Sequence, residues 1–415
     1  MRAVGESPVV PLRRASGFST LARMERIAIV AAARTPIGKF MGGLSSLSAV
    51  ELGAAAVQAT VARAGMAPTE VEEIIMGQAR QLGSGPNPAR QVAIKAGCGD
   101  GCVATTVNKA CGSSLKAIDL ARAAILLDGR KAVVAGGMES MTNIPFLLPN
   151  FRAGYRLGHV EVKDGNYQDG FTCGILGEPM GMTAEYLADE YHIGRQEQDE
   201  YALRSHQRGE QAQKDGRFTA EIAPITIAGK KGSVTIASDE HVRPGVTLGD
   251  LQKLPPVFRQ KTGTVHAGNS SGITDGGAAL LLMPQSEVQR RGLQPLAWLG
   301  ASATAGVAPR IMGIGPVPAV RTLLQKNGRA LGDYDLVELN EAFAAQMLAC
   351  LHDLPIAADR LNVNGGAIAL GHPIGATGAR IVVTLLHELV RRSGKRGLAS
   401  LCMSGGMGMA IEFER

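Results

Sequence analysis

Cys111 is the residue of this sequence whose surroundings best fit nucleophilic chemistry. It follows a predicted strand over residues 103–108 and opens a turn of small residues, Gly112, Ser113 and Ser114, where a helical pattern begins. Free backbone N–H groups and the positive end of the helix dipole at such a turn stabilise a thiolate. Small neighbours also leave room for a substrate carbonyl. The alternative interpretation is a core residue, because free cysteine is among the most buried residue types.

His372 lies in a second glycine-rich turn, Gly371-His372-Pro373-Ile374-Gly375, which also precedes a helical pattern. An imidazole held there is able to accept a thiol proton. A lone histidine in a turn is usually structural or exposed, but this turn belongs to a repeat. VNKACGSS…AGGME and LNVNGGA…SGGMG share the order strand, turn, helix, strand. In the second, residues 361–366 are the predicted first strand. An internal duplication would bring both turns to one cleft.

Two further polar positions follow predicted strands. Cys402 precedes Ser404 and its glycines, where exposed backbone amides are expected. A second thiol there is interpreted either as a general acid or base or as one half of a redox pair. Asn340 follows the apolar strand 336–339, a typical site position in α/β folds, although asparagine also caps helices well.

The elements that position these residues alternate between strands and helices, which is typical of the α/β class. The chain has 415 residues, 45% of them hydrophobic, enough for a large core and two or three domains. No apolar run reaches about 18 residues, so no membrane span is predicted. A net charge of +6 with only 4% aromatic residues excludes the basic, aromatic surface expected of a nucleic-acid-binding protein.

The six cysteines indicate a reducing compartment with free thiols. Cys98 and Cys102 are interpreted as structural, because no second ligand pair follows at zinc-site spacing, and no metal site is predicted. Residues 1–23 are rich in arginine and serine, as in a mitochondrial transit peptide. Their poor amphipathic pattern favours instead a disordered tail or an upstream start codon before Met24. We therefore expect a cytoplasmic protein, with the mitochondrial matrix as the alternative.

The order of the segments predicts an interrupted architecture. An N-terminal half over residues 24–140 plus 271–293 and a C-terminal half over 294–415 flank an inserted loop domain over 141–270. Within the insertion, residues 145–175 show little periodicity. A charged helical stretch over 182–215 follows, whose charges are expected to form mostly a solvated face.

Taken together, the motifs resemble those of the thiolases, in their acetyl-CoA C-acyltransferase branch. The matches run from Val30 to the C-terminus. In order they are Asn108–Ser113, Asn340–Phe343, Gly371–Ala376 and Cys402 with its glycines, supported by 87–91, 180–185 and 267–272. The joint order is specific, whereas a single motif is not. The resemblance implies a duplicated α-β-α-β-α layered fold with an inserted loop domain.

The resemblance also implies a role for each motif residue. Cys111 would carry the acyl group, His372 would activate it, and Cys402 would move the proton at the α-carbon of acetyl-CoA. Asn340 would position a water that, with His372 Nε2, forms one oxyanion hole. The backbone N–H groups of Cys111 and Ser404 would form the other. Family members usually have glycine where this chain has Ser404.

For coenzyme A, the resemblance implies four contacts. They are Ser271 and Phe258 against the pantetheine arm, Arg243 near the nucleotide, and Met180 in the acyl pocket. The segment from Phe258 to Ser271 is one residue longer than in biosynthetic members. Biosynthetic members often carry histidine at the position of Pro179. This difference argues against strict specificity for acetoacetyl-CoA, so longer 3-ketoacyl-CoA substrates are also considered.

The implied activity is reversible cleavage of 3-ketoacyl-CoA, or condensation of acetyl-CoA, in fatty-acid or acetoacetyl-CoA metabolism. Coenzyme A and acyl-CoA would be substrates, with no permanently bound cofactor, and the protein would be a homodimer or homotetramer. One alternative is a ketoacyl-synthase-type condensing enzyme, against which Cys402 argues, because those enzymes typically lack the second cysteine. The other is a catalytically weak acyl-CoA- or lipid-binding relative, which Ser404 keeps open.

Overall fold

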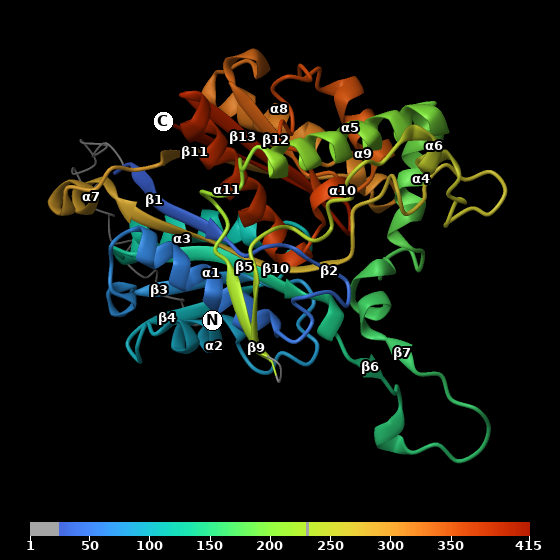
Figure 1. The fold of residues 1–415 in the computed structure, drawn as a ribbon, viewed down its shortest axis with the longest axis horizontal. Helices are drawn as coiled ribbons and strands as arrows, with labels where there is room; N and C mark the ends of the chain where they lie inside the picture. The colour runs from blue at the N-terminus through green and yellow to red at the C-terminus, as the bar shows by residue number, and fades with distance from the viewer. Residues whose placement is uncertain (1–24, 230–231) are drawn as a thin grey trace, which may run out of the picture.

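The first strand of the fold lies fully inside the core. The computed structural model describes residues 25–229 and 232–415, so the tail over residues 1–23 lies outside the described residues (Figure 1). All eight residues of β1 (Ile27–Arg34) are buried. No helix among the described residues is long and apolar enough to cross a membrane.

The largest sheet in the described chain has ten strands, in the order β12-β13-β14-β11-β1-β10-β5-β3-β4, with β2 paired to β10. Figure 1 shows the blue and teal strands of the N-terminal region beside the orange and red strands of the C-terminal region. The strands besides β1 are β2 (Gly38–Lys39), β3 (Glu73–Gly77), β4 (Val103–Val107), β5 (Val133–Ser140), β10 (Thr274–Pro284), β11 (Ala297–Gly306), β12 (Leu336–Leu339), β13 (Arg396–Met403) and β14 (Met407–Glu414).

The pairing of the strands repeats across the sheet. In one half β4 and β5 lie parallel to β3, and β10 and β1 follow in antiparallel steps. In the other half Leu361 bridges β12 in parallel, β12 pairs with β13 in parallel, and β14 and β11 follow antiparallel. The same series of pairings occurs twice, which supports the duplication inferred from the repeated motifs.

One predicted strand of the repeat is wrong. Residues 361–366 form only the single bridge from Leu361 to Val337, and not a strand. Asn362 and Gly365 take left-handed φ angles of 43° and 80°, which a β-strand does not accommodate. The stretch therefore turns at once into the short helix α10 (Ala367–Leu370).

Helices form three layers around the two halves of the sheet. In the middle, α3 (Ser113–Asp128) and α11 (Ile374–Arg392) pack on each other, and α11 contacts strands of both halves. The approach is close, since a Cβ on Gly378 would lie 2.4 Å from Leu115 N. The outer helices are α1 (Ala49–Arg63), α2 (Pro88–Ala96), α7 (Gln285–Arg291), α8 (Pro316–Asn327) and α9 (Ala344–Asp353). This is the predicted α-β-α-β-α layering.

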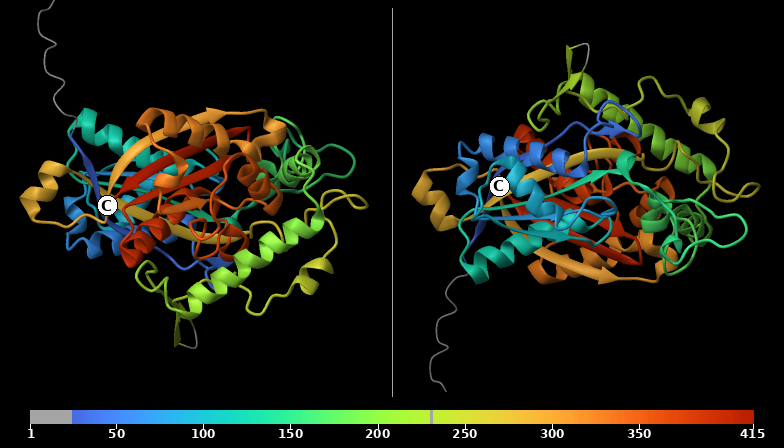
Figure 2. Two further views of the ribbon diagram at one scale, coloured as in Figure 1. Left: turned by 90° about the horizontal axis from the view of Figure 1, so that it is seen from above. Right: turned by 90° about the horizontal axis from the view of Figure 1, so that it is seen from below.

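Between β5 and β10 lies a long segment that contains two small antiparallel strand pairs and three helices. Its elements are β6 (Phe146–Leu147), β7 (Lys163–Asp164), α4 (Met180–Glu190), α5 (Arg195–Lys214), β8 (Ile225–Gly229), β9 (Gly232–Ile236) and α6 (Leu248–Gln252). The segment around β6 and β7 projects from the body as an arm, and α5 lies across the molecule (Figures 1 and 2).

The helical stretch predicted over 182–215 is in fact two helices. It is interrupted between Glu190 and Arg195, where His192 takes a left-handed φ of 54°. Most of its charged side chains are exposed or half-buried, as expected. In α5 the exception is Asp199, which is buried and bonds to His266.

Candidate active site

The turns that carry Cys111 and His372 meet where α3 and α11 begin. Cys111 lies two residues before α3, and His372 lies two residues before α11. Both side chains line one cavity of about 210 Å³. The sequence repeat predicted this meeting, and the close packing of the two central helices produces it.

Local bonds hold the Cys111 turn in an unusual shape. Ala110 has a left-handed φ of 48°, which turns the chain sharply ahead of the cysteine. Asn108 Oδ1 accepts the Ala110 N–H at 3.0 Å. Ser113 Oγ accepts the Lys109 N–H at 2.8 Å and donates to Ala110 O at 2.6 Å. The motif residues around Cys111 therefore serve to build the turn.

The thiol of Cys111 is subject to opposing influences. Burial raises its pKa, whereas Arg80 and the backbone N–H groups of Ser404 and Cys111 lower it, with burial dominating. The net pKa is above that of an ordinary cysteine. Cys111 is therefore a thiol at neutral pH and needs a base, and the same two N–H groups are available to an oxyanion near the sulfur.

His372 is oriented as that base by Thr377 on the first turn of α11. Thr377 Oγ lies 2.6 Å from His372 Nδ1 and donates its one hydrogen to Pro373 O at 3.0 Å. The hydroxyl therefore accepts from Nδ1–H, which leaves the lone pair on Nε2. Nε2 has no hydrogen-bond partner among the described residues. Burial, reinforced by Arg380 and Arg80, lowers the pKa of His372 to about 3, so the imidazole is neutral.

Gly371 is required for this turn. Its φ is 102°, and a Cβ there would lie 2.3 Å from Thr274 Cγ2. A side chain at this position would displace the neighbouring imidazole.

Cys402 lies directly behind the cavity wall. It is fully buried near the end of β13 and packs with Met312 and Ala342, both of which line the cavity. Burial raises its pKa well above the ordinary value, and Cys111 and Cys350 raise it further. Cys402 is therefore a neutral thiol, suited to donating a proton. The next turn contains Gly405 and Gly406 at left-handed φ angles of 85° and 88°. The backbone N–H of Ser404, just before them, lowers the pKa of Cys111.

Asn340 directly follows β12 (Leu336–Leu339), and its side chain makes no hydrogen bond among the described residues. It is buried, and neither its amide nitrogen nor its amide oxygen has a partner among the described residues. The capping alternative is not supported, because the residue at the N-cap of the following helix is Phe343. The adjacent Glu341 is structural, since it accepts bonds from Tyr201 and Ser205 of α5.

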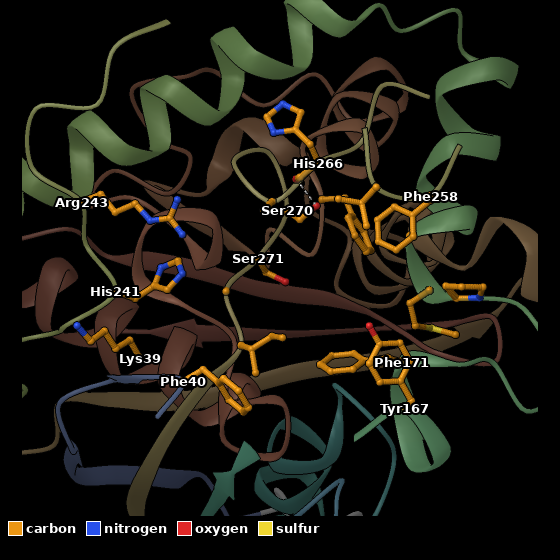
Figure 3. A pocket seen from close by; sticks show the side chains of 18 residues that line it. Lys39, Phe40, Tyr167, Phe171, His241, Arg243, Phe258, His266, Ser270 and Ser271 are labelled. Atoms are coloured by element: carbon orange, nitrogen blue, oxygen red, sulfur yellow. Dashed lines mark hydrogen bonds between the residues drawn. The ribbon is translucent and has the colours of Figure 1, made fainter. Parts of the chain in front are cut away.

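A second cavity of about 470 Å³ adjoins the first and contains all four residues predicted to contact coenzyme A. Arg243, Phe258, Ser271 and Met180 line it, and Ser271 and Met180 line both cavities. Figure 3 shows Lys39, His241 and Arg243 at one end, with Phe40 beside Lys39. Phe258, Phe171 and Tyr167 lie at the other end, and Ser271 lies between. One end is thus cationic and suited to phosphate. The other end is apolar and leads toward Cys111.

Sequence reasoning missed three residues of the site. Thr377 orients His372. The sequence feature that could have indicated this role is a hydroxyl residue five positions after a histidine at a helix start. Glu139 accepts N–H groups of Ala79, Arg80 and Gly375, and so ties the His372 turn to the other half. Arg80 enters the cavity itself.

Cys98 and Cys102 lie buried in a separate hydrophobic cluster, as their structural interpretation predicts.

Comparisons with known proteins agree along the whole described fold. The thiolase N-terminal domain matches residues 27–286 and the thiolase C-terminal domain matches 293–415. Acetyl-CoA acetyltransferase of Chromobacterium violaceum is 50% identical over 94% of this chain and 99% of that protein. The protein of that name from Cupriavidus necator is 49% identical over 94% and 100%.

Solved structures give the same result. The Bacillus anthracis acetyl-CoA acetyltransferase superposes with a TM-score of 0.92 at 45% identity, covering 94% of this chain and 99% of that one. Human mitochondrial 3-ketoacyl-CoA thiolase superposes with a TM-score of 0.91 at 41% identity, with coverages of 94% and 99%.

Proposed function

The chain belongs to the thiolase family, and from this premise we propose the residues that carry its reaction. The protein is an acyltransferase with thiolase activity on coenzyme A thioesters. Cleavage of a 3-ketoacyl-CoA by coenzyme A yields acetyl-CoA and a shortened acyl-CoA, and the condensation is the reverse. A ping-pong course through an acyl-cysteine accounts for both directions.

The first step forms the acyl-enzyme. His372 Nε2 takes the proton of Cys111, and the sulfur attacks the C3 carbonyl of the 3-ketoacyl-CoA. The new oxyanion receives hydrogen bonds from the backbone N–H groups of Cys111 and Ser404, the two groups that lower the pKa of the Cys111 thiol. Each such donor is worth about 2.7–4 kcal/mol in an acyl-transfer site. The side chain of Ser404 leaves this backbone donor in place.

The second step breaks the C2–C3 bond. The electron pair passes to the acetyl-CoA carbon as an enolate, whose oxygen faces His372 Nε2, now protonated, and a water held by Asn340. Cys402 then donates its proton to that carbon. The third step transfers the acyl group from Cys111 to the thiol of a new coenzyme A. The proton of that thiol passes to Cys402, and His372 returns its proton to the leaving sulfur of Cys111. No step needs a metal or a further cofactor, because a thioester exchanges with a thiol at little cost.

The single observation that carries this proposal is the state of the buried imidazole. Thr377 leaves His372 Nε2 with a lone pair, without a partner among the described residues, in the cavity that contains Cys111. A structural histidine at this depth would be expected to satisfy both ring nitrogens.

Coenzyme A fits the adjoining cavity. We assign Arg243 to the phosphates of the nucleotide, Phe258 and Ser271 to the pantetheine arm, and Met180 to the acyl end. This assignment is supported by the order of the lining residues, which change from cationic at the Arg243 end of the cavity to apolar at the end that leads toward Cys111.

The assay is turnover of acetoacetyl-CoA and coenzyme A, followed through loss of the Mg²⁺-enolate absorbance. It is repeated with longer 3-ketoacyl-CoAs to find the preferred chain length. Cys98→Ala, far from both cavities, serves as the control for loss of a buried thiol. Absence of turnover at every chain length would reject the proposed function.

We also propose a cytoplasmic homodimer or homotetramer, with the matrix as the alternative if residues 1–23 act in targeting. The bacterial origin of the relatives supports the first location. The arm carries large exposed apolar side chains, among them Phe146, Phe151 and Leu157, which suit a subunit contact. The boundaries 24–140 plus 271–293, 141–270 and 294–415 remain our proposed domain division. Light scattering of the purified protein measures the oligomer.

A further inference from the structure

Arg80 is a buried cation in the catalytic cavity that the reaction above does not use. It lies three residues after β3, is only 3% exposed, and lines the cavity together with Cys111 and His372. Its Nη1 donates to the Asp169 carbonyl oxygen at 3.3 Å, and its guanidinium lies 4.9 Å from the centre of the Phe171 ring.

The rest of the guanidinium has no partner. Neither Nε nor Nη2 of Arg80 makes a hydrogen bond within the described part of the chain. These two N–H groups share one edge of the guanidinium, the edge that binds a carboxylate through two parallel bonds. Both hydrogen-bond donors on this edge of Arg80 are therefore unused among the described residues.

No protein carboxylate fills this site among the described residues. The charge of Glu139 raises the pKa of Arg80. However, the Glu139 oxygens accept backbone N–H groups, and Glu139 makes no ion pair with the guanidinium. Asp164 and Asp169, in the more exposed arm, also raise the pKa of Arg80 without forming an ion pair with it. The remaining group that raises the pKa of Arg80 is Cys111.

Arg34 shows how the same fold treats a structural arginine. Its Nε lies 2.7 Å from Glu221 and its Nη1 lies 2.7 Å from Asp239, all inside the core. A buried charge is normally paired in this way, because an unpaired one is costly. The contrast indicates that the partner of Arg80 comes from outside the chain.

We propose that Arg80 binds a carboxylate at the far end of the acyl chain, so that the substrates include 3-ketoacyl-CoA thioesters of short dicarboxylic acids. This rests on the proposed function, because the acyl group must reach Cys111 in the same cavity. The volume of about 210 Å³ confines the chain to a few carbons. Phe171 and Met180, which also line the cavity, surround its methylene groups.

The chemistry is that of the proposed reaction. Cys111 sulfur bonds to C3, the C2–C3 bond breaks, and its electron pair stays on C2, which takes the proton of Cys402. The carboxyacyl group then passes from Cys111 to the thiol of coenzyme A. The terminal carboxylate is unchanged, and no oxidant or reductant takes part.

The test compares 3-oxoadipyl-CoA with 3-oxohexanoyl-CoA, which has the same chain length without the carboxylate, and uses acetoacetyl-CoA as the reference. The wild type should show kcat/KM at least tenfold higher for 3-oxoadipyl-CoA. Arg80→Leu should lose about 10- to 100-fold more on that substrate than on acetoacetyl-CoA or 3-oxohexanoyl-CoA, as expected for one unpaired charged hydrogen bond. Arg80→Lys should retain part of the preference. Arg122→Leu, on α3 outside both cavities, should leave the ratio unchanged.

Two results would overturn the proposal. One is equal kcat/KM for both six-carbon substrates in the wild type. The other is an equal loss on all substrates in Arg80→Leu, with alkylation of Cys111 by iodoacetamide shifted to higher pH, because Arg80 would then act only on the thiolate. Turnover of acetoacetyl-CoA separates these failures from failure of the proposed function. If Arg80→Leu does not fold, competition by succinyl-CoA against butyryl-CoA in the wild type decides, with stronger inhibition by succinyl-CoA expected.

Discussion

Replacing Thr377 with valine tests the hydrogen bond that gives His372 its basic nitrogen. In the wild type, His372 Nδ1 lies 2.6 Å from the Thr377 hydroxyl oxygen. Valine keeps the shape and branching of threonine but cannot accept the hydrogen bond from Nδ1–H. The productive tautomer then has an unpaired buried N–H, at a cost of about 1–3 kcal/mol. That cost corresponds to a fall of about 5- to 150-fold in the rate of Cys111 acylation.

The assay is rapid-quench acylation by acetyl-CoA, with the acyl-enzyme measured by mass spectrometry. Because Thr377 acts through His372, KM for acetyl-CoA should stay nearly constant while the acylation rate falls. Thr377→Ser keeps the hydroxyl and should recover most of the rate. The matched control is Thr384→Val on the same helix, where the lost bond leads to Glu221 and not to the site. Acylation of Thr377→Val at the wild-type rate would refute the assigned tautomer.

Three further predictions concern the neighbouring groups. Cys402→Ala should still be acylated by acetyl-CoA but should condense at least about 100-fold more slowly, the usual contribution of a positioned acid or base; equal loss in single-turnover acylation and condensation would contradict the division of roles. Ser404→Gly keeps the backbone N–H, so kcat in the acetoacetyl-CoA assay should change less than about threefold, against about 100-fold or more for loss of an oxyanion donor. Burial raises the pKa of Glu139 to about 7, so the folded state holds its proton more tightly than the unfolded state and stability falls between about pH 5 and pH 7. Glu139→Gln should therefore flatten the dependence of Tm on pH in that window, and an unchanged profile would show that Glu139 does not titrate there.

The sequence predicted the meeting of the two turns because repetition of a pattern carries three-dimensional information. If strand, turn and helix occur twice, the two turns are related by the same packing. The prediction failed locally where single residues adopt unusual backbone angles, at Asn362 and Gly365 in the repeat and at His192 between α4 and α5. Periodicity of apolar residues does not report such angles.

Other parts of the site could not be found from the sequence because they depend on contacts between distant segments. The missing ion pair of Arg80 is visible only when the positions of Glu139 and the arm are known. The free amide of Asn340 became distinguishable from a helix cap only when α9 was seen to begin at Ala344. The orienting role of Thr377 required the bond from its hydroxyl to Pro373.

The central claim is that Cys111 alone carries the acyl group. It is tested most directly by mixing the protein with acetyl-CoA, quenching in acid, and mapping the acetylated peptide by mass spectrometry. One acetyl group is expected on Cys111, none on the other five cysteines, and none in Cys111→Ala. An acetyl group on Cys402, or turnover of acetoacetyl-CoA by Cys111→Ala, would contradict it.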